Sequence, residues 1–317
     1  MSQARVINAD AIQGLKQVKD QTVQTCITSP PYWGLRDYGS DDQLGLEPTP
    51  EEYTENLVSV FREVRRVLRD DGTLWLNLGD SYIGGGRGGQ SAAKRSAGWQ
   101  PDYALRGYVP TGMKAKDLVG IPWRVAFALQ ADGWYLRSDI IWHKPNPMPE
   151  SVTDRPTKAH EYLFLLTKSP RYYYDVDAIR EEYLTDNDKG LTKEERLRRN
   201  PHLRSGVSRS AVKGFGPSQM KGQPGGRNKR SVWTVTTKPF KGAHFAVFPP
   251  DLIEPCVLAG SAEGDTVLDP FTGSGTTGMV ALRHGRDFVG TELNPEYAAM
   301  AEQRIAEDAP LLNEVAA

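Results

Sequence analysis

Residues 265–278 read DTVLDPFTGSGTTG, and this stretch indicates the fold of the chain. Its Thr-Val-Leu run predicts a short strand that ends at Asp269. Glycines at 273, 275 and 278 then predict a turn that leads into a helix. Such glycines let a ligand approach the backbone, and the N–H groups at a helix N-terminus suit an anionic group. The stretch therefore predicts a ligand-binding strand, turn and helix.

An acidic residue, Glu292, closes the next predicted strand, 23 residues after Asp269. An acid at this place commonly holds the ribose hydroxyls of an adenosine-containing cofactor. The missing Gly-Lys-Ser/Thr excludes a P-loop, and Asp-Pro-Phe stands where a dinucleotide site would begin its glycines. A carboxylate at 269 suits the ammonium group of S-adenosylmethionine, and the backbone N–H groups of 274–276 suit its carboxylate. We therefore predict S-adenosylmethionine as the cofactor.

The pattern around this stretch alternates between the periods of strands and helices. Strands are predicted within 5–10, 22–29, 73–80, 135–144, 265–269 and 286–293, and 161–168 is a further apolar run. Helices are predicted within 49–72, 121–133, 248–260 and 274–285. This alternation predicts a Rossmann-like α/β domain with a mostly parallel, twisted sheet.

The charge of the chain is concentrated in one segment. The net charge is only -1, but residues 189–230 contain 12 Lys or Arg against two Glu. The segment is also rich in Gly and Ser, so it is either a solvated loop or a surface that binds a polyanion. We predict a basic target-recognition insert at 181–235, within a catalytic and cofactor-binding domain formed by 1–180 and 236–317.

Composition excludes several other classes of protein. Cys26 and Cys256 are the only cysteines, so a disulfide framework and a cysteine-rich metal site are excluded, and no metal is predicted. The isolated His143 and His160 do not change this view. The chain has no apolar run long enough for a membrane span, and its N-terminus has no apolar signal segment. A cytoplasmic protein of bacterial or phage origin is expected.

A second unusual stretch, TSPPYWG at residues 28–34, follows the apolar run TVQTCI. Two prolines remove two backbone donors and stiffen the chain, and two aromatics follow at once. Together with DPFTGSGTTG, the motif TSPPY resembles the catalytic and cofactor motifs of DNA amino-methyltransferases. The catalytic motif comes first and the basic segment lies between the two, which is similar to the β-class motif order. The resemblance covers most of the chain outside 189–230.

This resemblance implies a role for each motif residue. Ser29 Oγ and the Pro30 carbonyl would accept both N–H groups of an exocyclic amine and so localise its lone pair. Pro31 would fix the turn, and Tyr32 would stack on an extruded base. The implied cofactor-binding residues are Asp10, Thr28, Phe248, Asp269, Pro270, Phe271, Gly273, Ser274, Gly275, Thr276 and Glu292. The charge of the basic segment, rather than a family motif, predicts the DNA-binding residues Arg198, Arg199, Arg204, Arg209 and Lys213.

Within that implied cofactor site, four side chains have separate tasks. Asp10 and Phe271 would contact the adenine, Glu292 the ribose, and Phe248 would complete the methionine pocket. Asp10 also has a simpler interpretation, because an Asp at a strand end often caps a helix.

The predicted activity is site-specific methyl transfer from S-adenosylmethionine to double-stranded DNA. A motif led by serine favours cytosine N4 as the target, and adenine N6 is the alternative. Methylation of RNA or of protein glutamine is disfavoured, because an Asn-Pro-Pro-Tyr motif is commoner there. A further alternative is a non-catalytic nucleic-acid-binding protein that has kept the fold. The sequence leaves open a homodimer and a cognate restriction endonuclease.

Overall fold

The computed structural model describes residues 2–34, 43–84, 110, 112–181, 226–237 and 248–308, and the backbone of 313–315. The chain folds into two compact units, one formed by Met1–Tyr174 with Ser231–Ala317 and the other by Asp175–Arg230. The described ends of the second unit meet in a bridge, in which Glu181 and Arg227 exchange two backbone hydrogen bonds of 2.9 Å.

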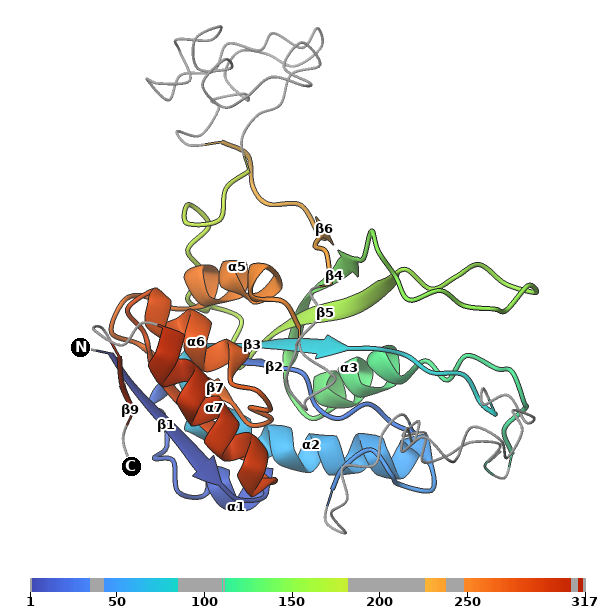
Figure 1. Cartoon of the computed structure of the whole chain (residues 1–317), viewed down its shortest axis with the longest axis horizontal. Coiled ribbons are helices and arrows are strands. Elements are labelled where there is room, and N and C mark those ends of the chain that lie inside the picture. The colour runs from blue at the N-terminus through green and yellow to red at the C-terminus, as the bar shows by residue number, and fades with distance from the viewer. Residues whose placement is uncertain are drawn as a thin grey trace, which may run out of the picture. The chain divides into compact units, whose positions relative to one another are not determined.

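The first unit is built on a nine-stranded sheet (Figure 1). Its strands lie in the order β6-β4-β5-β3-β2-β7-β8-β1-β9. Among the described strands, β5 alone runs antiparallel to its neighbours, so the predicted, mostly parallel sheet is confirmed. The strand bounds are β1 Ser2–Asn8, β2 Val23–Thr28, β3 Leu68–Leu78, β4 Tyr135–His143, β5 His160–Thr167, β6 Val232–Thr234, β7 Thr266–Asp269, β8 Asp287–Glu292 and β9 Asn313–Val315.

Strands β2 and β7 mark the point where the chain reverses its direction across the sheet. From β7 the chain passes through helix α6 (Thr276–Arg283) to β8 on one side, and from β2 it passes through α2 (Pro50–Val67) to β3 on the other. Because β2 and β7 are parallel neighbours, their carboxyl ends lie at the same edge. In open α/β sheets, ligands bind in the crevice outside such a pair of strand ends.

Helices cover both faces of the sheet (Figure 1). One layer contains α1 (Ala11–Leu15), α2 and α3 (Ile121–Ala131); the other contains α5 (Pro250–Gly260), α6 and α7 (Pro295–Asp308). Within the described residues, no helix is long and apolar enough to span a membrane.

The longest helix, α2, follows from its sequence. Thr49 caps its N-terminus by accepting from the Glu52 N–H group, and Pro50 stands at its first position. Its apolar residues recur at helical spacing and are buried against the sheet: Tyr53, Leu57, Val60, Phe61 and Val64. The chain then turns directly into β3 at Leu68, five residues before the predicted start of that strand.

The predicted elements are present, but the short or terminal ones were not predicted. The sequence reasoning did not find α1, β6, α7 or β9. The first, second and last of these have five residues or fewer, too few for a periodic pattern to emerge.

Candidate active site

A hydrogen bond joins the two motifs at the carboxyl edge of the sheet. Thr28, the last residue of β2, is fully buried and donates from Oγ1 to Asp269 Oδ1 over 2.6 Å. Asp269 is the last residue of β7. The Ser-Pro-Pro-Tyr motif begins at Ser29, directly after Thr28, so this bond holds the start of the motif beside the cofactor motif.

The Asp269 carboxylate is surrounded by protein donors. Besides Thr28, it accepts from Thr277 Oγ1 at 2.7 Å and from the Phe271 N–H group at 3.0 Å. The residue is only 1% exposed, and this burial raises the pKa of its carboxyl to about 6, although the three donors oppose the shift. Its negative charge is therefore available near neutral pH and is lost in mild acid.

Two further carboxylates end the neighbouring strands. Glu292 closes β8, and its two oxygens accept from the Gly273 N–H group at 2.9 Å and from the Asn294 N–H group at 3.0 Å. Burial raises the pKa of Glu292. Asp10 follows β1 and caps α1, because its Oδ1 accepts from the Ile12 N–H group at 2.9 Å. The capping role considered for Asp10 is therefore present in the fold.

The glycines of the cofactor motif serve the packing of α6. Gly275 has a φ of 77°, and a Cβ atom there would lie 3.0 Å from Ala301 Cα in α7. A Cβ atom at Gly278 would lie 2.6 Å from Ile305 Cδ1 and 2.7 Å from Phe288 Cδ1. These two glycines thus let α6 approach α7 and β8, a reason that differs from the ligand approach expected of them.

The hydroxyl groups of Ser274 and Thr276 face α7. Arg304 donates to Ser274 Oγ at 2.8 Å and to Thr276 Oγ1 at 2.9 Å. Both side chains are also buried, and their contacts with a cofactor stay predictions. Among the other predicted cofactor residues, Pro270 and Gly273 are buried, while Phe271 and Phe248 are half-buried.

The catalytic motif is held by residues that lie far from it in the sequence. Tyr53 of α2 donates from its hydroxyl to the Pro31 carbonyl at 2.8 Å. Trp33 is buried and donates from Nε1 to the Glu47 carbonyl at 2.9 Å. Within the described residues, no group donates to the Pro30 carbonyl. The role of the Pro30 carbonyl as the backbone acceptor stays a prediction.

The hydroxyl of Tyr32 lies in a polar cluster at the ends of β3 and β5. It lies 2.8 Å from Glu161 Oε2 and 3.1 Å from Asn77 Oδ1, and Ser29 Oγ donates to it at 3.3 Å. Lys144, the residue after β4, donates to Glu161 Oε1. Burial, and then the Glu161 carboxylate, raise the pKa of Tyr32 well above its ordinary value.

Sequence reasoning missed Glu161, Asn77 and Tyr53. One signal for Glu161 was present, because a single carboxylate opens the apolar run EYLFLLTK. A charged residue in a strand that is otherwise buried requires partners. Nothing in the sequence indicated that Tyr32 would be among them.

The predicted DNA-binding residues lie outside the described part of the chain: Arg198, Arg199, Arg204, Arg209 and Lys213. Among the described residues, no group of three or more His, Cys, Asp or Glu could hold a metal ion. Both cysteines are buried and form no disulfide, and Cys256 lies in the core as expected for a helical apolar pattern.

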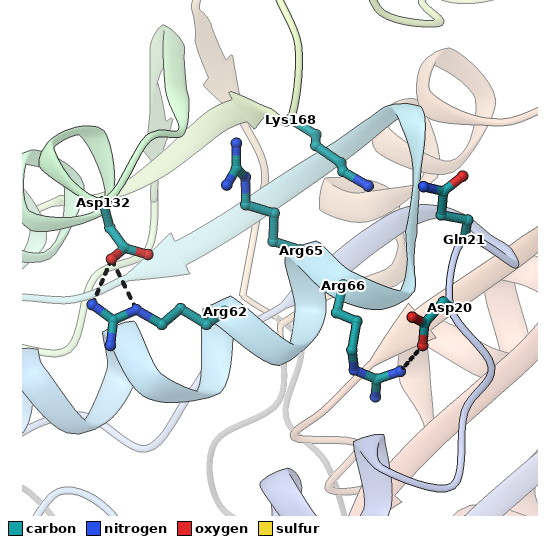
Figure 2. Close-up of a pocket in the computed structure, with 7 residues that line it drawn as sticks. All are labelled: Asp20, Gln21, Arg62, Arg65, Arg66, Asp132 and Lys168. Atoms are coloured by element: carbon teal, nitrogen blue, oxygen red, sulfur yellow. Dashed lines mark hydrogen bonds and ion pairs between the residues drawn. The ribbon is translucent and has the colours of Figure 1, made fainter.

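A cavity of about 370 Å³ lies at the opposite edge of the sheet, where β2 and β3 begin (Figure 2). Most of its cations are paired, Arg62 with Asp132 and Arg66 with Asp20. Lys168 likewise lies 3.1 Å from Asp70. The cavity is lined by Asp20, Gln21, Arg62, Arg65, Arg66, Asp132 and Lys168, and none of them belongs to either motif.

Comparisons with known proteins match nearly the whole chain. The model of a family described as DNA methylase, with N6 and N4 methyltransferases in its name, matches residues 23–303. The Type II methyltransferase M.Cfr9I of Citrobacter freundii is 50% identical over 95% of this chain and 87% of its own length. The Type II methyltransferase M.XycI of Xanthomonas campestris pv. cyanopsidis is 49% identical over the same shares.

A solved structure has a similar fold, and the similarity extends over nearly the whole of both chains. The crystal structure of TTHA0409, a DNA modification methylase of Thermus thermophilus complexed with S-adenosyl-L-methionine, has a TM-score of 0.59 and 25% identity to this chain. The alignment covers 99% of this chain and 98% of the other.

Proposed function

The chain belongs to the N6 and N4 methyltransferase family of DNA methylases, which depend on S-adenosylmethionine, and we propose that it methylates cytosine at N4 in double-stranded DNA. The observation that carries the proposal is the hydrogen bond from Thr28 to Asp269. It joins the end of the catalytic strand to the end of the cofactor strand, so the two motifs can act on two ligands held side by side.

The cofactor fits the groups at this edge. When bound, S-adenosylmethionine supplies a methyl group on a positively charged sulfur. Each oxygen of Glu292 accepts one backbone N–H bond and keeps a lone pair for a ribose hydroxyl. Asp269 provides negative charge beside the motif for an ammonium group, and half-buried Phe271 provides an apolar surface for an adenine. These roles, with those of Asp10, Thr28 and Phe248, are proposals.

The catalytic motif would activate the amine of the target base. An exocyclic amino group is a poor nucleophile because its lone pair is delocalised into the ring. Ser29 Oγ and the Pro30 carbonyl would accept its two N–H groups and localise that lone pair. Tyr53 supports this assignment of the backbone acceptor, because its hydroxyl already occupies the Pro31 carbonyl. Positioning of this kind supplies a large part of catalysis in a transfer between two bound groups.

The choice of base rests on the first residue of the motif. Within the family, a serine at this place goes most often with cytosine N4 and an aspartate with adenine N6. Ser29 is neutral and is half-buried beside Tyr32, so it can approach an amino group without adding a second buried charge to that of Glu161.

The basic segment is proposed as the site-selecting DNA surface. Its 12 cations against two acids support contact with the DNA backbone. Neutralising Arg198, Arg199 and Arg204 together should flatten the dependence of DNA affinity on salt, with cofactor affinity unchanged. The relatives named Type II methyltransferases support a restriction–modification role with an endonuclease that acts on the same site. A homodimer stays a prediction.

Mass spectrometry of nucleosides tests the base. DNA incubated with the protein and S-adenosylmethionine should contain N4-methylcytosine, and DNA incubated with Ser29→Ala should contain much less. N6-methyladenine instead would overturn the choice of cytosine. If DNA that contains all short sequence contexts yields no methylated nucleoside, the proposed activity is wrong.

A further inference from the structure

A chain of hydrogen bonds connects Glu161 to the catalytic serine. Glu161 Oε2 lies 2.8 Å from the Tyr32 hydroxyl, which in turn lies 3.3 Å from Ser29 Oγ. Asn77 borders the same hydroxyl through its Oδ1 at 3.1 Å. The Glu161 side chain is 15% exposed, so water does not readily replace these partners.

The groups around Glu161 determine which atom donates in each of these hydrogen bonds. Lys144 donates to Glu161 Oε1, and a carboxylate paired with an ammonium group accepts hydrogen bonds through its oxygens. The Asn77 amide is oriented as well, because its Nδ2 donates to the Tyr162 carbonyl at 3.0 Å and to Glu161 Oε2 at 3.2 Å. Its oxygen must then face Tyr32.

The Tyr32 hydroxyl is consequently bordered by two acceptors, Glu161 Oε2 and Asn77 Oδ1. It has one proton, which it must donate to that pair, and its oxygen can accept only from the remaining neighbour. In the part of the chain that the structure describes, that neighbour is Ser29, whose hydroxyl proton therefore points at Tyr32. The raised pKa of Tyr32 agrees with a neutral phenol that donates.

This direction matters for the chemistry of Ser29. A serine hydroxyl can rotate and can either donate or accept. An amino group that is to be activated needs an acceptor, because hydrogen bonds from its N–H groups localise its lone pair. Because Ser29 donates its hydroxyl proton to Tyr32, the lone pairs of Ser29 Oγ can accept a hydrogen bond from another group.

We propose that Glu161 is a positioning residue that makes Ser29 Oγ a hydrogen-bond acceptor toward the target amino group, acting through Tyr32. The inference rests on the proposed function of Ser29. It assigns to β5 a part in the reaction, although no residue of β5 need touch the base or the cofactor.

Glu161→Gln tests the direction while keeping the shape of the side chain. Lys144 should attract the amide oxygen of the new side chain, so the amide nitrogen would face Tyr32 and compete with Ser29 as its donor. The turnover number with saturating DNA should fall about tenfold, the effect of one misdirected hydrogen bond. The KM values for DNA and for S-adenosylmethionine should stay near those of the parent.

A double-mutant cycle distinguishes positioning from a general structural role. In a Ser29→Ala background, Glu161→Gln should cause little further loss, because the serine through which it acts is gone. Glu63→Gln, which removes the carboxylate paired with Arg66 at the opposite edge of the sheet, is the matched control and should keep parental turnover.

Two results would overturn the inference. One is parental turnover in Glu161→Gln, and the other is an equal fractional loss with and without Ser29. Failure of the proposed function is distinguishable from both, because the parent protein itself would then leave DNA unmethylated.

Discussion

The cofactor motif and the catalytic motif end neighbouring strands, yet they are held in place by different parts of the chain. Asp269 receives two of its three hydrogen bonds from Phe271 and Thr277, two and eight residues further on, and the third from Thr28 of β2. The catalytic motif is braced instead by Tyr53 and Glu161, 22 and 129 residues away from their partners.

This difference separates local from long-range support. The cofactor end, meaning Asp269 and the turn that follows β7, should tolerate changes elsewhere in the fold. Most of the groups that donate hydrogen bonds to Asp269 belong to that turn and the start of α6. The catalytic end, meaning the Ser-Pro-Pro-Tyr motif after β2, should lose its geometry when residues on α2, β3 or β5 are changed. Loss of turnover without loss of cofactor affinity is therefore the expected result of changes on those elements.

Ser29→Ala should give the largest effect on turnover. It removes the side-chain acceptor for the target amino group, a contact worth ~1–3 kcal/mol, so turnover with saturating DNA should fall at least about tenfold. Calorimetry without DNA should show nearly parental affinity for S-adenosylmethionine. Unchanged turnover would contradict the assigned role of the motif.

Gly79→Ala should lower turnover through the Tyr32 ring. A Cβ atom at Gly79 would lie 2.5 Å from Tyr32 Cε2 and 2.9 Å from Cδ2, so we expect the ring to move and its hydroxyl to be displaced from Glu161. We expect a loss of about tenfold with cofactor affinity retained. Gly72→Ala is the matched control, since a Cβ atom there would lie 2.9 Å from the Arg69 carbonyl of the same strand, β3, and away from the motif. Equal losses in the two variants would mean that general destabilisation explains the result.

The cofactor end should reveal itself by its pH dependence. If an ionised Asp269 holds the cofactor ammonium, affinity should be constant above pH 7 and should fall as the pH drops through about 6. Because protonation removes the charge from most molecules at pH 5, the affinity there should be about tenfold below that at pH 7. Calorimetry across this range measures the loss, and Asp269→Asn should lose that part of the dependence.

Protonation of Asp269 does not itself favour unfolding in acid. The folded-state pKa of Asp269 is raised above its ordinary value of 3.8, so folding favours the protonated form. Its contribution to the free energy of unfolding is therefore greatest below pH 4 and declines as the pH rises through 6. Thermal unfolding measured at pH 5 and at pH 7 provides the control.

The same distinction explains which parts of the site could be predicted from the sequence. The strand, Asp-Pro-Phe turn, glycines and Glu292 lie within 265–292, so their spacing predicted their assembly. Asp10 joins them because β1 pairs with β8, with Asn8 opposite Glu292. The family resemblance implied the role of Asp10, but the pairing of β1 with β8 was not predicted from the sequence.

The partners of the catalytic motif could not be predicted in this way. Glu161 reaches Tyr32 because β5 runs antiparallel beside β3, with Tyr162 opposite Leu78. Neither the neighbours of a strand nor its register can be read from its own residues when the run is almost wholly apolar. The packing role of Gly275 and Gly278 was missed for a related reason, since α7 was not predicted.

Tyr53→Phe should give the smallest effect and tests the long-range bracing most directly. The Tyr53 side chain is fully buried, and the substitution removes only the hydroxyl that donates to the Pro31 carbonyl at 2.8 Å. We expect the free energy of unfolding to fall by about 1 kcal/mol and turnover by about threefold, because this bond steadies the turn but does not itself accept the amine. Cofactor affinity should not change.

Denaturant unfolding and turnover with saturating DNA measure the two effects, and Tyr135→Phe on an exposed ring is the control. If Tyr53→Phe lost as much turnover as Ser29→Ala, the orientation of the backbone carbonyls would matter as much as the side-chain acceptor. If it weakened cofactor binding instead, the two strand ends would not be held independently.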